Sequence, residues 1–192
     1  CGLYQIDYKT IPLDDNFCVS LEDYAQPNGG IIIPNPNAPT GIALSLDAIE
    51  TILKNTNSVV IIDEAYVCFG TESAVRLINQ YPNLLVVQTL SKSRSLAGLR
   101  VGYALGHADL IKGLKRVKNS FNSYPIDSMA SAIAIASIGD DAYFQQCNEK
   151  IITSRGWLTQ SLLELAFSVL PSSSNFLFVQ HQSELASTLY NG

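Results

Sequence analysis

The segment Thr89-Leu-Ser-Lys-Ser-Arg-Ser-Leu-Ala-Gly-Leu-Arg-Val-Gly-Tyr103 joins two apolar stretches, residues 84–90 and 101–105. Both stretches have the length and composition typical of β-strands. Between them lie Lys92 and Arg100. A lysine at a strand end, with leucines on both sides, is expected to be partly desolvated, which favours the uncharged, nucleophilic amine. The alternative interpretation is a surface loop in which both cations are solvated.

Alternating strand and helix patterns precede this segment. Residues 29–33 and 59–62 are β-branched runs typical of strands that are buried on both faces. Residues 45–54 have apolar positions at helical spacing, with Ser45 as a capping residue, and residues 74–81 predict a second helix. This order predicts an α/β fold: a mostly parallel sheet flanked by helices, with right-handed crossovers.

The remaining residues predict mainly helices. We expect helices over residues 107–118, 126–138 and roughly 141–167, and a strand after the loop that begins at Pro171. The polar and apolar alternation over residues 3–8 predicts one more strand. The core candidates of the longest helix are Trp157, Leu158, Leu162, Leu163 and Leu165.

The composition argues against several classes of protein. A net charge of -5 provides no basic field for nucleic acid, and no apolar run is long enough to cross a membrane. Four cysteines without a C-x-x-C pair favour reduced thiols and a cytoplasmic location. Two distant histidines suggest no metal site. One basic cluster is interpreted as the solvated end of a helix; it contains Lys112, Lys115, Arg116 and Lys118.

Polar side chains follow three of the predicted strands, where ligands of open parallel sheets usually bind. Alternative roles are structural, since asparagine forms turns and aspartate caps helices. Pyridoxal phosphate would use all of these groups: a lysine amine, a carboxylate for the pyridine nitrogen, donors to the 3-oxygen, and a hydroxyl and a guanidinium for the phosphate. The candidates are Asn35, Asn37, Asp63, Tyr66, Ser91, Lys92 and Arg100.

The motifs N-P-N-A-P-T-G, D-E-A-Y and S-K-S-R-S-L-A-G-L-R-V-G-Y resemble those of fold-type-I pyridoxal phosphate aminotransferases, and most of all the histidinol-phosphate aminotransferase branch. The resemblance implies that Lys92 forms an aldimine with the cofactor and later moves the substrate proton. It also implies that Asp63 pairs with the pyridinium and that Tyr66 donates to the 3-oxygen. Ser91 and Arg100 would hold the phosphate.

The sequence departs from this family at Ala38, where the family usually has asparagine. We therefore assign the second donor to the 3-oxygen to Asn37, with Asn35 or a water molecule as alternatives. Family members are about twice as long, and the chain opens without methionine, so we expect an excerpt of a longer protein. By resemblance, residues 1–140 are part of the large cofactor-binding domain, and residues 141–192 begin a small α+β C-terminal domain.

The resemblance implies ping-pong transfer of an amino group from an amino acid or amino alcohol phosphate to 2-oxoglutarate, in histidine biosynthesis and by a homodimer. A related alternative is a pyridoxal phosphate-dependent phosphothreonine decarboxylase, in which the same arrangement would release carboxylate. A third possibility is a catalytically inert, truncated module that is stabilised as a dimer through its apolar surfaces.

Overall fold

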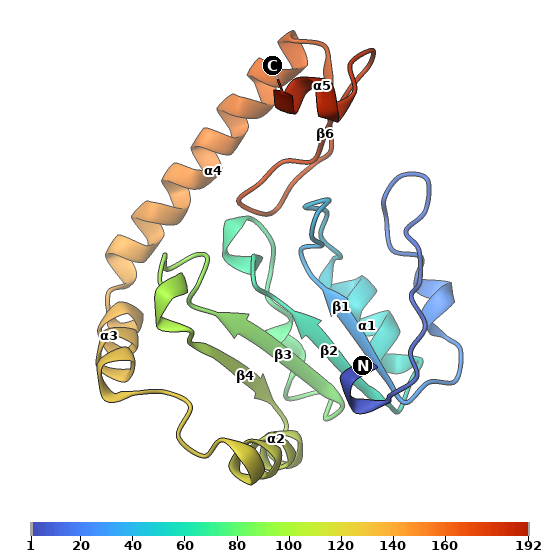
Figure 1. The fold of residues 1–192 in the computed structure, drawn as a ribbon. Coiled ribbons are helices and arrows are strands. Elements are labelled where there is room, and N and C mark those ends of the chain that lie inside the picture. Colours follow the sequence, from blue (N-terminus) through green and yellow to red (C-terminus); the bar gives the residue numbers. More distant parts are fainter. Residues whose placement is uncertain (1, 192) are drawn as a thin grey trace.

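The computed structural model describes residues 2–191 and contains a four-stranded and a two-stranded sheet (Figure 1). In the larger sheet the strands follow the chain order β1-β2-β3-β4. The first three strands are parallel, and the fourth is antiparallel to the third. These strands are β1 (Gly30–Pro34), β2 (Val59–Asp63), β3 (Leu84–Thr89) and β4 (Gly102–Gly106). The predicted α/β fold with a mostly parallel sheet is confirmed.

Five α-helices occur in the described chain. They are α1 (Leu46–Lys54), α2 (Ala108–Phe121), α3 (Ser128–Gly139), α4 (Asp141–Glu164) and α5 (Ala186–Asn191). Figure 1 shows α4 rising beside the larger sheet, with β6 and α5 at its far end. The smaller sheet pairs β5 (Phe167–Val169) with β6 (Val179–His181) in antiparallel orientation.

Short 3-10 helices connect several of these elements. They are η1 (Gly2–Tyr4), η2 (Leu21–Tyr24), η3 (Val67–Phe69), η4 (Ala74–Leu77) and η5 (Ala97–Leu99). The helix predicted over residues 74–81 is therefore only the short η4, which a turn follows, and Pro82 disfavours helical backbone at Tyr81. The strand predicted over residues 3–8 is wrong, since η1 and irregular backbone occupy this segment.

The main core lies on one face of the larger sheet. Alternate strand residues meet the apolar side of α1 there, together with η2 and η4. Ile33 is 2% exposed, whereas its neighbour Ile32 is 65% exposed. The prediction that β1 is buried on both faces is wrong, because the helices of the main core cover only the Ile33 side. The buried core residues are Ile31, Ile33, Ile49, Ile52, Leu53, Val60, Ile62, Ala74, Leu77, Leu84 and Val86.

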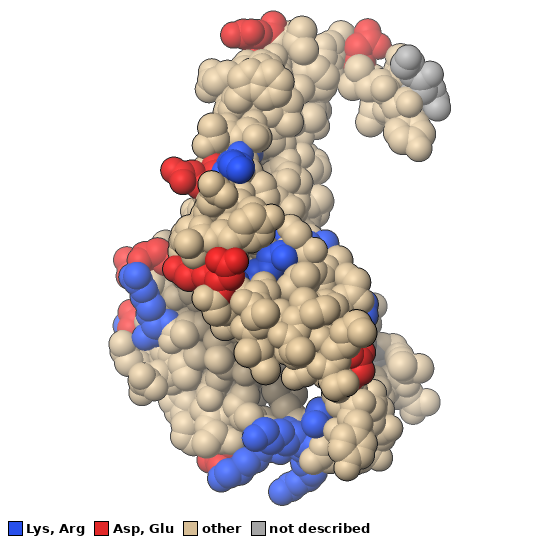
Figure 2. All heavy atoms as spheres, turned by 90° about the vertical axis from the view of Figure 1, so that its left-hand side faces the viewer, with Lys and Arg blue, Asp and Glu red and all other residues tan. Residues whose placement is uncertain are grey.

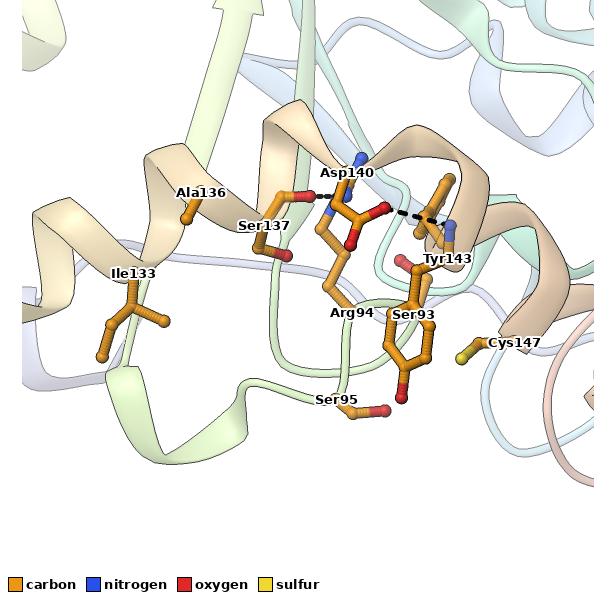
Figure 3. A pocket seen from close by; sticks show the side chains of 10 residues that line it. Ser93, Arg94, Ser95, Ile133, Ala136, Ser137, Asp140, Tyr143 and Cys147 are labelled. Carbon is orange, nitrogen blue, oxygen red and sulfur yellow. Dashed lines mark hydrogen bonds between the residues drawn. The ribbon is translucent and has the colours of Figure 1, made fainter.

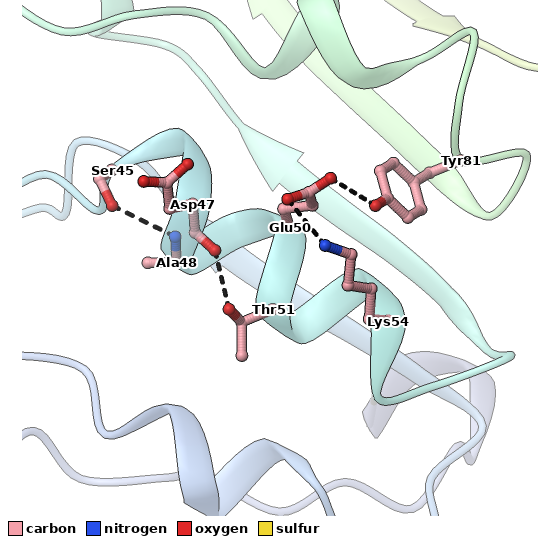
Figure 4. Close-up of polar contacts among 7 residues, drawn as sticks. All are labelled: Ser45, Asp47, Ala48, Glu50, Thr51, Lys54 and Tyr81. Carbon is pink, nitrogen blue, oxygen red and sulfur yellow. Dashed lines mark hydrogen bonds and ion pairs between the residues drawn. The ribbon is translucent and has the colours of Figure 1, made fainter.

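Polar contacts fix the ends of α1 (Figure 4). Ser45 Oγ accepts a 3.2 Å hydrogen bond from the amide of Ala48, which satisfies one of the free N–H groups at the helix start. Near the other end, Glu50 forms a 2.9 Å ion pair with Lys54 and accepts a 2.6 Å hydrogen bond from Tyr81. The Tyr81 contact joins α1 to the segment that leads into β3.

Helix α4 differs from its prediction in length and in burial. It ends at Glu164, and the interpretation of its large apolar residues as core is wrong for all but Leu162, which is half-buried. Trp157 is 69% exposed, and Leu165, just after the helix, is 64% exposed. Leu158 and Leu163 are also exposed. The physical reason is that α4 extends past the larger sheet, and no other part of residues 2–191 covers these side chains.

Two further observations concern the whole described chain. Among residues 2–191, no helix combines the length and the apolar character needed to cross a bilayer. Cys18, Cys68 and Cys147 are free thiols, and Cys1 lies outside the described residues.

Candidate functional site

A cavity of about 340 Å³ lies where β2 and β3 end and β4 begins. Parallel β2 and β3 place their carboxyl ends at the same edge of the sheet, and the connection after β3 folds back beside them. Three of the predicted residues, Asp63, Ser91 and Arg100, therefore meet at this edge, as expected for ligand sites at the carboxyl ends of parallel strands. The cavity is lined by Asp63, Ala65, Val87, Gln88, Thr89, Ser91, Arg100, Val101 and Gly102.

Asp63 is half-buried at the last position of β2. Its Oδ1 accepts a 3.1 Å hydrogen bond from the amide of Ala65, so part of the predicted capping role is present. The other carboxylate oxygen accepts no hydrogen bond within residues 2–191. Capping the turn therefore leaves Asp63 with an acceptor beside the cavity for a cationic or N–H group.

Ser91 and Arg100 approach the cavity from the loop between β3 and β4. The Ser91 amide donates a 3.1 Å hydrogen bond to Thr89 Oγ1, and the two hydroxyl oxygens are 3.0 Å apart. Arg100 follows η5 in a left-handed conformation, with φ of 55°. Its guanidinium Nη1 donates a 2.9 Å hydrogen bond to Ala97 O. This backbone is uncommon for arginine, and it directs the chain back into β4 at the cavity wall. A hydroxyl and a guanidinium at one end of a cavity suit an anion such as phosphate.

Lys92 lies near Tyr66 but does not line the cavity. Its Nζ is 5.6 Å from the centroid of the Tyr66 ring. Lys92 is exposed, so the predicted apolar enclosure of its amine is wrong. The leucines that flank it in sequence pack elsewhere: Leu90, Leu96 and Leu99 form a small core with Val101, Ala130 and Ala134, the last two from α3.

The asparagines of the proline-rich loop have different environments. Asn35 is 1% exposed, and its side chain exchanges hydrogen bonds of 2.7 and 3.3 Å with the backbone of Leu44, so its amide is already used to hold the loop. Asn37 accepts a 2.9 Å hydrogen bond from Thr40 through Oδ1, and its Nδ2 donates to no other residue of the described chain. Of the two asparagines, Asn37 is the one with a donor left for a ligand.

The loop that carries Lys92 also contacts helices α3 and α4 through the residues that follow Lys92. Figure 3 shows a second hollow, of about 250 Å³, between residues 93–95 and the junction of α3 and α4. The Arg94 guanidinium lies 3.9 Å from the centroid of the Phe144 ring and donates to the carbonyl of Ser137. The hydrogen bond attaches the Lys92 loop to the end of α3, and the cation–π contact attaches it to the start of α4.

Glu64 was missed in the sequence. It is buried beside Asp63 in the D-E-A-Y motif, and burial raises the pKa of its carboxyl group despite three donors. These are Ser73 Oγ at 2.6 Å, the Ala74 amide at 2.6 Å and Gln88 Nε2 at 2.8 Å. The only signal in the sequence was that Glu64 is a second acidic residue in this motif. That signal does not reveal its three hydrogen-bond donors, which lie nine or more residues further along the chain.

The basic cluster predicted in the sequence lies away from the cavity. Figure 2 shows Lys and Arg side chains gathered at the lower end of the molecule, where α2 lies. All four residues of the cluster are on α2 and are exposed. This agrees with their interpretation as a solvated helix face.

Comparisons with known proteins agree on a family. Residues 1–191 match the family model described as aminotransferase class I and II. The chain is 60% identical over 194 residues to histidinol-phosphate aminotransferase 1 of Pseudomonas aeruginosa, covering 98% of this chain and 55% of that protein. The chain thus spans about half the length of the curated relatives it matches.

Solved structures share the fold. The crystal structure of the histidinol-phosphate aminotransferase from Clostridium acetobutylicum matches 93% of this chain and 56% of its own, with a TM-score of 0.85 and 26% identity. A decarboxylase from Sulfurospirillum multivorans matches 93% of this chain and 55% of its own, with a TM-score of 0.80 and 26% identity.

Proposed function

The chain belongs to the class I and II aminotransferase family, and on that premise we propose that it binds pyridoxal phosphate in the cavity at the ends of β2 and β3. The observation that carries the proposal is the shared position of Asp63, Ser91 and Arg100 around this cavity. A carboxylate, a hydroxyl and a guanidinium are the groups that the pyridine nitrogen and the phosphate of this cofactor require. The donor set of the chain therefore fits the cofactor.

Each residue would act on a different part of the cofactor. Asp63 would hold the proton on the pyridine nitrogen through its unused carboxylate oxygen. Ser91 and Arg100 would bind the phosphate. Asn37 and Tyr66 would donate to the 3-oxygen, and the Lys92 amine would hold the aldehyde carbon and move a proton at the substrate α-carbon. The bound cofactor would supply the electron sink that stabilises charge at that carbon.

We further propose that the whole protein transfers an amino group from histidinol phosphate or a similar amino alcohol phosphate to 2-oxoglutarate, in histidine biosynthesis. The support is the name and the 60% identity of the Pseudomonas aeruginosa relative. A cytoplasmic homodimer belongs to the same proposal. The decarboxylase alternative has weaker support, since the decarboxylase from Sulfurospirillum multivorans shares 26% identity with this chain, against 60% for the Pseudomonas aeruginosa relative.

We also propose a domain boundary near residue 140, with residues 1–140 in the cofactor-binding domain and residues 141–192 beginning a smaller one. The support is the separation of the two sheets. The larger sheet ends with β4, whereas β5 and β6 pair only with each other and follow α4.

The test of the cofactor site is the visible absorbance of the chain after addition of pyridoxal phosphate. We expect a new band that borohydride reduction converts into a permanent label on Lys92, identified by peptide mapping. Lys92→Ala should abolish both the band and the label. Lys150→Ala, which removes an exposed lysine of α4, is the matched control and should retain them. A label on other lysines, or a band that persists in Lys92→Ala, would contradict the proposal.

A further inference from the structure

The segment Ser172–Phe176, called the serine loop below, returns from β5 to the larger sheet. The amide of Ser173 donates a 2.8 Å hydrogen bond to the carbonyl of Gly41, which ends the proline-rich loop. The Phe176 ring meets the Tyr66 ring edge to face, with centroids 5.0 Å apart and an interplanar angle of 86°. One loop thus contacts both segments that carry the proposed donors to the 3-oxygen.

Internal hydrogen bonds give the serine loop a defined shape. Ser172 Oγ donates to Phe176 O at 2.7 Å and accepts from the Ser174 amide at 3.1 Å. Ser174, which is fully buried, places its own hydroxyl 3.2 Å from the same Phe176 carbonyl. The hydroxyls of Ser172 and Ser174 therefore both hold the Phe176 carbonyl, and with it the backbone that carries the Phe176 ring; the Ser172 contact is the shorter of the two.

The serine loop fits closely against Gly41. This glycine has φ of 81°, and a Cβ placed on it would lie 2.5 Å from Ser172 Oγ. The Gly41 amide in turn donates a 2.8 Å hydrogen bond to Asn37 O, and the Asn37 amide donates to Ile42 O at 2.8 Å. Gly41 therefore links the serine loop to the Asn37 segment: its carbonyl accepts from Ser173, and its amide donates to Asn37.

Arg155 of α4 attaches the same loop to the segment that follows Tyr66. One guanidinium nitrogen donates a 2.8 Å hydrogen bond to Phe69 O and also donates to Ser174 O. Burial lowers the pKa of this guanidinium, as expected for a cation partly removed from water. The bonds to the two carbonyls hold the serine loop and η3 at a fixed separation.

From these contacts we infer that the serine loop positions Asn37 and Tyr66, with Ser172 and Phe176 as positioning residues for the donors to the 3-oxygen of the cofactor. The inference rests on the proposed function for the roles of the two donors. Donors that are held in place stabilise the ionised 3-oxygen, so they lower the pH at which the cofactor's visible absorbance changes. Loosening them should raise that midpoint.

The first experiment compares Phe176→Leu with Phe178→Leu in the chain loaded with pyridoxal phosphate. Phe178 is the matched control, because it lies two residues after the serine loop and contacts Phe17, with ring centroids 5.3 Å apart. Phe176→Leu should raise the pH midpoint of the visible absorbance by about one unit, the size expected for weakening one charge-assisted hydrogen bond. Phe178→Leu should leave it unchanged. An unchanged midpoint in Phe176→Leu, or equal shifts in both variants, would overturn the inference.

The second experiment needs no cofactor and so separates this inference from the proposed function. Ser172→Ala removes the hydroxyl that holds Phe176 O. The loosened serine loop should accelerate hydrogen exchange at the Gly41 amide, which donates to Asn37 O, about three- to tenfold, a change that corresponds to the free energy of one hydrogen bond. Ser173→Ala is the control, since its backbone amide still reaches Gly41. Unchanged exchange in Ser172→Ala would refute the positioning role. If wild type shows no Lys92-dependent band, the proposed function fails, and the exchange result still decides whether the serine loop holds the Asn37 segment.

Discussion

The hydroxyl of Ser73 donates a 2.6 Å hydrogen bond to Oε2 of Glu64, whose side chain is closed to solvent. Gln88 Nε2 donates to the same oxygen, and Tyr103 donates a 2.7 Å hydrogen bond to Gln88 Oε1. The buried carboxyl group thus joins the end of β2 to the β3–β4 pair. Burial raises the pKa of Glu64 more than its three donors lower it.

Glu64 should make stability depend on pH. The folded state binds the Glu64 proton more tightly than the unfolded state, in which the pKa has its ordinary value of 4.5. The stabilisation is therefore complete below that value and is lost as the pH rises through the higher folded-state pKa. In urea unfolding from about pH 4 to pH 8, the free energy of unfolding of wild type relative to Glu64→Gln should fall as the pH rises. Glu149→Gln, at an exposed site, is the control, and a slope for Glu64→Gln equal to that of wild type would refute this role.

Adjacent isoleucines of β1 should differ sharply in their contribution to stability. Ile33→Ala removes a side chain from the main core and should cost about 2–5 kcal/mol of unfolding free energy. Ile32→Ala removes the same atoms from a side chain that is 65% exposed, so the loss should be much smaller. Equal losses in chemical unfolding would show that both faces of the strand are covered in solution.

Gly41 should not tolerate a side chain. Gly41→Ala places a Cβ 2.5 Å from Ser172 Oγ on a backbone with φ of 81°, and we expect a loss of about 1–3 kcal/mol in unfolding free energy. Gly98→Ala is the matched control, because a Cβ at Gly98 meets nothing within 4 Å. The measurement is urea unfolding of both variants. Similar stabilities would mean that the serine loop moves away from Gly41 without cost.

The sequence identified the four strands of the larger sheet because their apolar runs are local signals, whereas β5 was not predicted and the strand expected over residues 3–8 is wrong. The shared cavity position of Asp63, Ser91 and Arg100 also followed from a general rule about strand ends, once the order of strands and helices was recognised. The roles of these residues toward a cofactor stay predictions.

Long-range contacts were not predictable from local patterns. The apolar neighbours of Lys92 suggested an enclosed amine, but Leu96 and Leu99 pack on α3, which lies later in the chain. The burial of β1 on one face also depends on which helices reach the sheet, and its isoleucine run contains no such information. The contact of Phe176 with Tyr66 joins residues far apart in the sequence. Periodicity reports the neighbours of a residue along the chain, whereas these features depend on neighbours in space.

Arg100 provides the sharpest test of how the cavity recognises a ligand. If its guanidinium binds the phosphate, Arg100→Ala should weaken pyridoxal phosphate by about 10- to 100-fold, which corresponds to the loss of a hydrogen bond between charged groups. Pyridoxal has the same ring and aldehyde but no phosphate, so its affinity should change little. Arg116→Ala removes an exposed arginine of α2 and should affect neither ligand. Equal losses for the two ligands in a fluorescence titration would mean that Arg100 shapes the turn into β4 through its left-handed backbone and does not contact the phosphate.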